Sequence, residues 1–288
     1  MSVSDSASEA LLDPSAGSGP AERVAELAPW RRWYLRNERL VLGLTGFVSV
    51  LIVWEAAARL GLIKLVLLSS PTRIYDAALA EVRIGQIWGH LGVSLQEFVL
   101  GFVIAAILGV LIGFVAGWFR RANYVLDPWL AALYATPDVA LVPLIILWLG
   151  IGLESKVFVV FLTSLFAVAI NTLMGVQSTD IRMIEVARSF GASQLTLFRT
   201  VVLPSTVPFI LTGLRLATGR ALVGVVLAEL IASNQGIGFM ISQAGVTLNT
   251  ARMMVGVILL GLFGVFLGEV MRRVEQRFDV WRPQVGNV

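Results

Sequence analysis

Long stretches without any charged residue constrain this chain more than any other feature. Three of them run over residues 98–119, 157–179 and 230–251. An α-helix rises about 1.5 Å per residue, so a bilayer core about 30 Å thick needs about 20 residues. Only 14% of the chain is charged, whereas soluble domains carry about 25%. The sequence therefore predicts an all-α, polytopic membrane protein.

Hydropathy divides the chain into a tail and a membrane domain. Residues 1–29 are rich in Ser, Ala, Gly, Pro and acidic side chains, and they lack the basic start and apolar stretch of a signal peptide. We expect them to form a disordered cytoplasmic tail. Residues 30–288 are expected to form the transmembrane domain. Its six predicted spans are about 40–60, 92–118, 127–150, 156–177, 206–232 and 252–271.

Arginine placement predicts the orientation. Arginines precede the first span, follow the second, lie between the fourth and fifth, and follow the sixth. With an even number of spans, all these groups fall on one side, which the positive-inside rule makes cytoplasmic. Both termini are then cytoplasmic. The opposite loops are poorer in arginine, although Arg73 and Arg83 lie in the long outer segment 61–91. Ser70 and Pro71 in that segment fit the cap and first residue of a short interfacial helix.

Two spans carry patterns with structural meaning. The second has a small residue at every fourth position, which lets helices approach closely in lipid, and we expect this stripe to pack inside one subunit rather than to face a ligand. Its members are Gly101, Ala105, Gly109, Gly113 and Gly117. The third span is interrupted by Pro137-Asp138 and by Pro143, and each interior proline removes a backbone hydrogen bond. Either a nearby water-filled pathway or a packing kink explains such a break.

The composition excludes several kinds of chemistry. There is no cysteine, which removes disulfides, thiolate metal sites and cysteine nucleophiles. The single histidine, His90, cannot form a histidine cluster. A Walker A loop needs Gly-Lys followed by Ser or Thr, but Lys64 and Lys156 are followed by Leu and Val. The chain is thus expected to do no covalent chemistry and to bind no ATP through such a loop.

A polar loop, residues 178–205, separates the fourth and fifth spans. Asp180 is placed to cap a first short helix, and Gly191 is placed to end it in the left-handed conformation. Ser193 is placed to cap a second helix, and Pro204 and Pro208 punctuate the start of the fifth span. Two helices held rigidly on the cytoplasmic face would transmit force from a protein outside the bilayer to the membrane spans.

This loop resembles a signature of the permease subunits of type I ABC importers: Glu-Ala-Ala, three residues, Gly, nine residues, Ile, one residue, Leu-Pro. Glu185, Ala187, Gly191 and Leu203-Pro204 match at the family's spacing, whereas Val186 and Val201 replace its Ala and Ile. The likeness runs from about residue 40 to Pro283 and is strongest to the nitrate/sulfonate/taurine/bicarbonate group. It rests also on segments such as Pro143–Gly152, Ala228-Glu229 with Gly236-Ile-Gly238, and Trp281-Arg-Pro283.

The resemblance implies how the protein works and with what. Residues near Glu185 to Gly191, Arg188 included, would dock into a groove of a separate ATPase subunit, which binds ATP and Mg²⁺. The implied assembly is a homodimer of permeases with two ATPase subunits and an extracytoplasmic solute-binding protein in a bacterial inner membrane. No nucleic-acid partner and no cofactor in this chain are expected. The solute is expected to be small and anionic, such as nitrate, a sulfonate, taurine or bicarbonate; an aromatic acid or a vitamin precursor is the alternative.

Charged residues within the spans are candidates for the pathway, because each costs about 2.5–3.5 kcal/mol on insertion scales and usually faces a cavity or bundle interior. Arg220 falls near the middle of the fifth span. It either attracts an anionic solute or forms a structural ion pair with Glu229, Asp138 or Glu55. Arg215 lies nearer the cytoplasmic end and can snorkel. The candidate pathway residues are therefore Arg220, Asp138, Arg215 and Glu229; Glu55 and Arg59 can pair on one face of the first span.

Two other classes fit the sequence less well. A secondary transporter or channel would show inverted repeats or paired acidic relays in the membrane, and it would give the loop no role. An intramembrane enzyme would need histidine, cysteine or clustered acids at membrane depth, whereas the acids here are scattered. The sequence therefore favours an importer subunit over both.

Overall fold

The computed structural model describes residues 29–277, with side chains from Asn37 onward, and the chain forms two compact units, residues 1–63 and 64–288. Within the first unit lies helix α3, Pro29–Arg59, whose part from Asn37 is long and apolar enough to cross a membrane. The predicted pair within it is confirmed, since Arg59 Nε lies 2.7 Å from Glu55 Oε1. The expected tail falls almost entirely on residues 1–28, outside the described residues.

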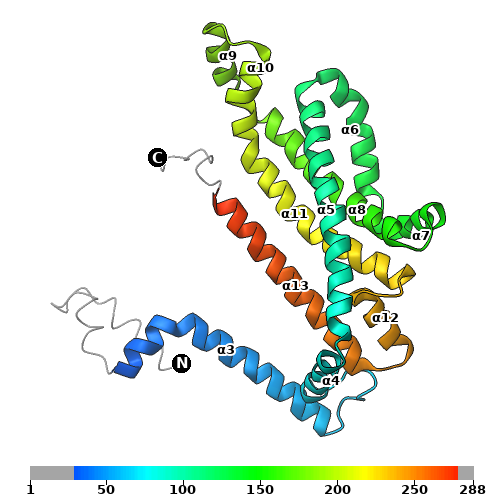
Figure 1. Cartoon of the computed structure of the whole chain (residues 1–288). Coiled ribbons are helices and arrows are strands. Elements are labelled where there is room, and N and C mark those ends of the chain that lie inside the picture. The colour runs from blue at the N-terminus through cyan, green and yellow to red at the C-terminus, as the bar shows by residue number, and fades with distance from the viewer. Residues whose placement is uncertain (1–28, 278–288) are drawn as a thin grey trace, which may run out of the picture. The chain divides into compact units, whose positions relative to one another are not determined.

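The regular elements in the described part of the second unit are all helices (Figure 1). Its elements are α4 Pro71–Ile84, α5 Gln86–Trp118, α6 Arg120–Ala135, α7 Asp138–Leu149, α8 Leu153–Gln177, α9 Ile181–Ser189, α10 Gln194–Leu197, a π-helical turn Phe198–Val202, α11 Leu203–Ala232, α12 Ile237–Val246 and α13 Thr250–Arg277. Helices α9 and α10 lie at one end of this unit, and α4 and α12 lie at the opposite end (Figure 1). Ser70 and Pro71 begin α4 as predicted.

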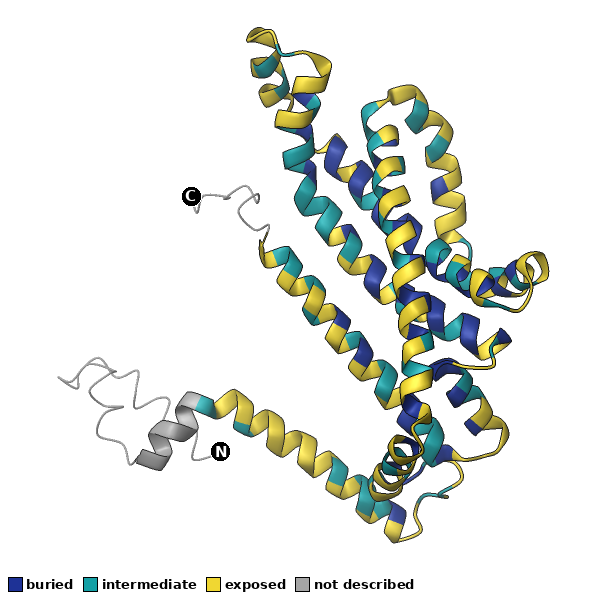
Figure 2. Ribbon diagram, viewed as in Figure 1, coloured by how far each residue is buried: buried dark blue, intermediate teal, exposed yellow. Residues whose placement is uncertain are grey.

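Helix α8 is the centre of the unit, and glycines bring its neighbours close to it. A Cβ atom added at Gly113 of α5 would lie 2.5 Å from Thr172 Cβ, and one added at Gly224 of α11 would lie 2.5 Å from Thr163 Oγ1. The prediction that the small-residue stripe of α5 packs inside the subunit is therefore confirmed. Figure 2 shows the buried residues gathered where α5, α8 and α11 meet, with exposed residues on the outer faces.

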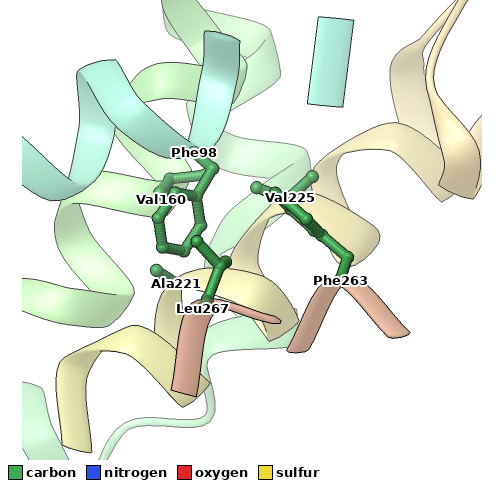
Figure 3. Packing of buried hydrophobic residues seen from close by; sticks show 6 residues of the cluster. All are labelled: Phe98, Val160, Ala221, Val225, Phe263 and Leu267. Carbon is green, nitrogen blue, oxygen red and sulfur yellow. The ribbon is translucent and has the colours of Figure 1, made fainter. Parts of the chain in front are cut away.

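A cluster of apolar side chains joins α13 to this centre. Phe98 of α5 packs with Val160 of α8, with Ala221 and Val225 of α11, and with Phe263 and Leu267 of α13 (Figure 3). The rings of Phe98 and Phe263 meet edge to face, with centroids 5.8 Å apart, a geometry that adds to the gain from burial alone. Four helices thus share one core layer.

The third predicted span differs from the expectation. Five helices of the described chain are long and apolar enough to cross a membrane, and α6 with α7 makes a sixth only as a pair bent by 100°. The helix also begins at Arg120 rather than after Pro128, which lies inside α6. The bend follows from Pro137, because a proline disfavours the helical conformation of the preceding residue, and Thr136 is extended with ψ of 130°. Pro143, by contrast, lies within α7 without ending it.

Pro204 lies in the first turn of α11, at the start of the fifth span as expected. The second loop helix and this span are not separated, however, because α10 continues through the π turn into α11 without a break. Pro204 has no N–H to donate to the preceding turn, and the chain adopts the wider π spacing immediately before it. The second loop helix and the fifth span are therefore one continuous helix, Gln194–Ala232.

Candidate functional site

The loop between α8 and α11 has the helix boundaries that its sequence predicted. Asp180 caps α9, accepting a hydrogen bond of 2.9 Å from the backbone N–H of Arg182. Gly191 has φ of +77°, and Ser193 caps α10. Thr179 and Ser205 hydroxyls, 3.0 Å apart, tie the two ends of the loop together. These contacts give the short helices a fixed geometry on the bundle.

One face of α9 is anchored on the bundle. Ile184 and Ala187 pack against a cluster that includes Val176 of α8 and the buried Leu197 and Val202. Phe198 completes it, meeting the rings of Phe114 and Trp118 of α5 edge to face. Ala187, a residue of the sequence signature, is thus a packing residue that fixes α9 to α5, α8 and the π turn.

The other face of α9 is exposed and partly apolar. Val186 is 56% exposed and Phe190 is 86% exposed, and Ile181 and Met183 are also exposed. Glu185 and Arg188 are exposed beside them. Leu203 and Pro204 are half-buried at the start of α11. The signature residues therefore differ in place: Glu185 and Val186 are exposed on α9, Ala187 packs beneath it, and Leu203 and Pro204 begin the membrane helix.

Arg220 is paired with Asp138, one of the three partners that the sequence allowed. Its Nη1 atom lies 3.4 Å from Asp138 Oδ2, and its guanidinium lies over the Tyr134 ring at 4.5 Å from the centroid. The pair joins the middle of α11 to the bend between α6 and α7. Arg220 also lines a cavity of about 330 Å³ together with Tyr134, Ala167, Ile170, Asn171, Leu216 and Gly219.

Arg215 and Glu229 are not among the residues that line this cavity. Arg215 Nη1 is 3.4 Å from Glu275 Oε2 of α13, and its side chain is otherwise exposed. Glu229 is buried at the other end of α11, where it accepts hydrogen bonds of 2.6 Å from the Ser94 hydroxyl and from the Gly238 backbone N–H. The four candidate pathway residues thus occupy three separate places.

Glu229 belongs to a buried polar cluster that the sequence interpretation did not assemble. Glu97 of α5 forms an ion pair with Lys156 of α8, and both are buried. Lys156 Nζ also donates to Ser233 Oγ at 3.1 Å. A signal was present in the sequence: Glu97 and Lys156 each stand at the edge of an uncharged stretch, where a charge is expensive unless it is paired.

The described helices define an all-α polytopic membrane protein. Residues 105–280 match the sequence model of the family described as binding-protein-dependent transport system inner membrane component, and the chain belongs to this family of ABC importer permeases. It is 34% identical over 271 residues to a putative aliphatic sulfonates transport permease protein, SsuC of Bacillus subtilis, covering 93% of this chain and 96% of that protein.

A second relative is also a transport permease, and a solved ABC transporter structure has a similar fold. The taurine transport system permease protein TauC of Escherichia coli is 31% identical over 259 residues, covering 88% of this chain and 94% of TauC. A crystal structure of an amino acid ABC transporter with histidines superposes with a TM-score of 0.55 at 19% identity, covering 70% of this chain and 96% of that one. At that identity the likeness shows the fold.

Proposed function

We propose that this chain forms the translocation pathway of an ABC importer and is driven through α9 by a separate ATPase subunit. The observation that carries the proposal is the division of α9 into two faces: one packed on α5, α8 and the π turn through Ile184 and Ala187, the other exposed through Val186, Met183 and Phe190. A rigidly anchored helix with an exposed apolar face suits docking to another protein.

The continuity from α10 into α11 supports this role. A displacement of the loop is carried into the membrane by a single rod, residues 194–232, rather than absorbed at a flexible joint. When ATP draws two ATPase subunits together, the loops of two permease copies would approach and reorient the spans, giving alternating access. A homodimer, two ATPases and an extracytoplasmic solute-binding protein make up the proposed complex, in a bacterial inner membrane with both termini cytoplasmic.

Co-purification tests the docking role of α9. Val186→Asp places a charge on the exposed apolar face, and it should abolish recovery of the ATPase with the tagged permease. Val246→Asp is the matched control, since Val246 is 84% exposed at the opposite end of the unit. It should leave recovery unchanged. Loss of the ATPase from both variants, or from neither, would contradict the proposed docking face.

We propose a small anionic solute of the sulfonate, taurine, nitrate or bicarbonate kind. The SsuC and TauC likenesses support this class, and Arg220 supplies a cation at the cavity that α6, α8 and α11 line. An aromatic acid or a vitamin precursor is the alternative, which the Ile170 and Leu216 walls of the cavity would suit. A binding screen of the partner solute-binding protein against both classes separates them.

Arg220→Gln tests whether this arginine serves the solute or only the fold. It removes the charge while keeping a polar side chain, and it should abolish uptake while the assembled complex and its basal ATPase activity persist. Uptake by reconstituted vesicles and recovery of the complex are measured side by side. Loss of the complex would assign Arg220 to structure alone, with Asp138 as its partner.

A further inference from the structure

A buried charge cluster lies at the end of the bundle that carries α12. Glu97 of α5, Lys156 of α8 and Glu229 of α11 come together there. The side chains of Glu97 and Lys156 are 0% and 10% exposed. Glu229 is 1% exposed. Two carboxyl groups and one ammonium group therefore share a site that water scarcely reaches.

Other charged groups near the cluster do not balance it. His90 of α5 accepts a hydrogen bond at Nδ1 from the Gly236 backbone N–H at 3.1 Å, so this nitrogen carries no proton. Arg252 of α13 pairs with Glu81 of α4 at 2.8 Å, a separate neutral pair. With both carboxyls ionised, the cluster would hold one negative charge in excess, which a low-dielectric interior strongly disfavours.

The contacts of Glu97 indicate that a proton supplies the missing positive charge. Its carboxyl is paired with Lys156, yet Oε2 is buried without a hydrogen-bond donor among the described residues. Glu229 lies next to it, since its Oε1 accepts a hydrogen bond from Ser94, one helical turn before Glu97 on α5. Two ionised carboxylates are both acceptors only, so a hydrogen bond between them requires a proton on one of the two.

We propose that Glu97 and Glu229 bind a single shared proton, which makes the cluster with Lys156 neutral. The proton belongs to the pair rather than to either residue. Glu229 also accepts a hydrogen bond from the Gly238 backbone N–H. Ser94, which donates to Glu229, accepts one from the Ile237 backbone N–H at 2.9 Å. The shared proton therefore connects α5 and α11 at the point where α12 begins. A movement that separates α11 from α5 there would release it.

Infrared spectroscopy of the purified full chain tests how many carboxyl groups of the cluster are protonated. At mildly alkaline pH, where exposed carboxyls are ionised, the wild type should show the carbonyl stretch of one buried protonated carboxyl. Glu229→Gln and Glu97→Gln should each abolish this band, because the remaining carboxylate then balances Lys156. Glu154→Gln, an exposed residue at the start of α8, should leave it unchanged.

Removal of the lysine gives the opposite result and completes the test. Lys156→Met leaves two carboxyls without a cation, so the band should double. If the N-terminus of α12 instead stabilises a second carboxylate, the wild type will show no band, and that result overturns the proposal. A band that persists in both glutamine variants belongs to another residue and also overturns it.

Discussion

The end of the 64–288 unit that carries α9 and the end that carries α12 contain the same kinds of parts: a short helix, a glycine with positive φ, and charged side chains. At the α9 end these parts are exposed. A Cβ atom added at Gly191, where φ is +77°, would meet no atom of the described residues within 4 Å, and Arg182 is solvated beside Asp180. At the α12 end, Gly236 faces the Glu229 carboxyl directly, and the ions are buried.

This difference shows what each end is suited to do. An exposed end with fixed helix boundaries can accept a partner without repacking. A buried end whose glycines, hydroxyls and carboxyls fit one another holds α5, α8, α11 and α12 in one arrangement, and it cannot change without breaking several hydrogen bonds. Substitutions at the two ends should therefore have very different costs.

The largest difference is expected between the two ion pairs. Lys156→Met leaves buried carboxyls without their cation and should lower the free energy of unfolding by about 4 kcal/mol. Arg182→Met, at a solvated pair, should leave it within error. Thermal unfolding of the purified variants in one detergent measures both. Equal shifts would show that the α12 end is not the more tightly coupled one.

A smaller difference is expected between the two glycines. Gly191→Ala strains a left-handed position and should cost about 1–2 kcal/mol. Gly236→Ala adds overlap with the Glu229 carboxyl to the same kind of strain, since φ is +117° there, and should cost about 3 kcal/mol. The same unfolding experiment compares them. A Gly236→Ala variant as stable as Gly191→Ala would mean that the carboxylate can move aside.

Local signals account for what the sequence predicted well. The caps Asp180 and Ser193, the terminator Gly191 and the small-residue stripe of α5 each depend on a few neighbouring residues, and the structure has all of them. The spans followed from length and hydropathy, and five of the six are single helices.

The features that the sequence did not predict are the angle between two helices and the contacts between residues far apart in the sequence. Pro137 predicted an interruption, but not a bend of 100° between α6 and α7. The choice of Asp138 as the partner of Arg220 and the meeting of Glu97, Lys156 and Glu229 join residues far apart in sequence. Pairing of this kind cannot be obtained from hydropathy or spacing.

Site-specific cross-linking tests the proposed driving contact most directly. The chain has no cysteine, so Met183→Cys introduces a single thiol on the exposed face of α9, to which a photoreactive maleimide can be attached. In membranes containing the whole complex, this position should form a covalent product with the ATPase subunit, and Val246→Cys at the opposite end should not. A product from Val246→Cys alone, or from neither position, would contradict the account.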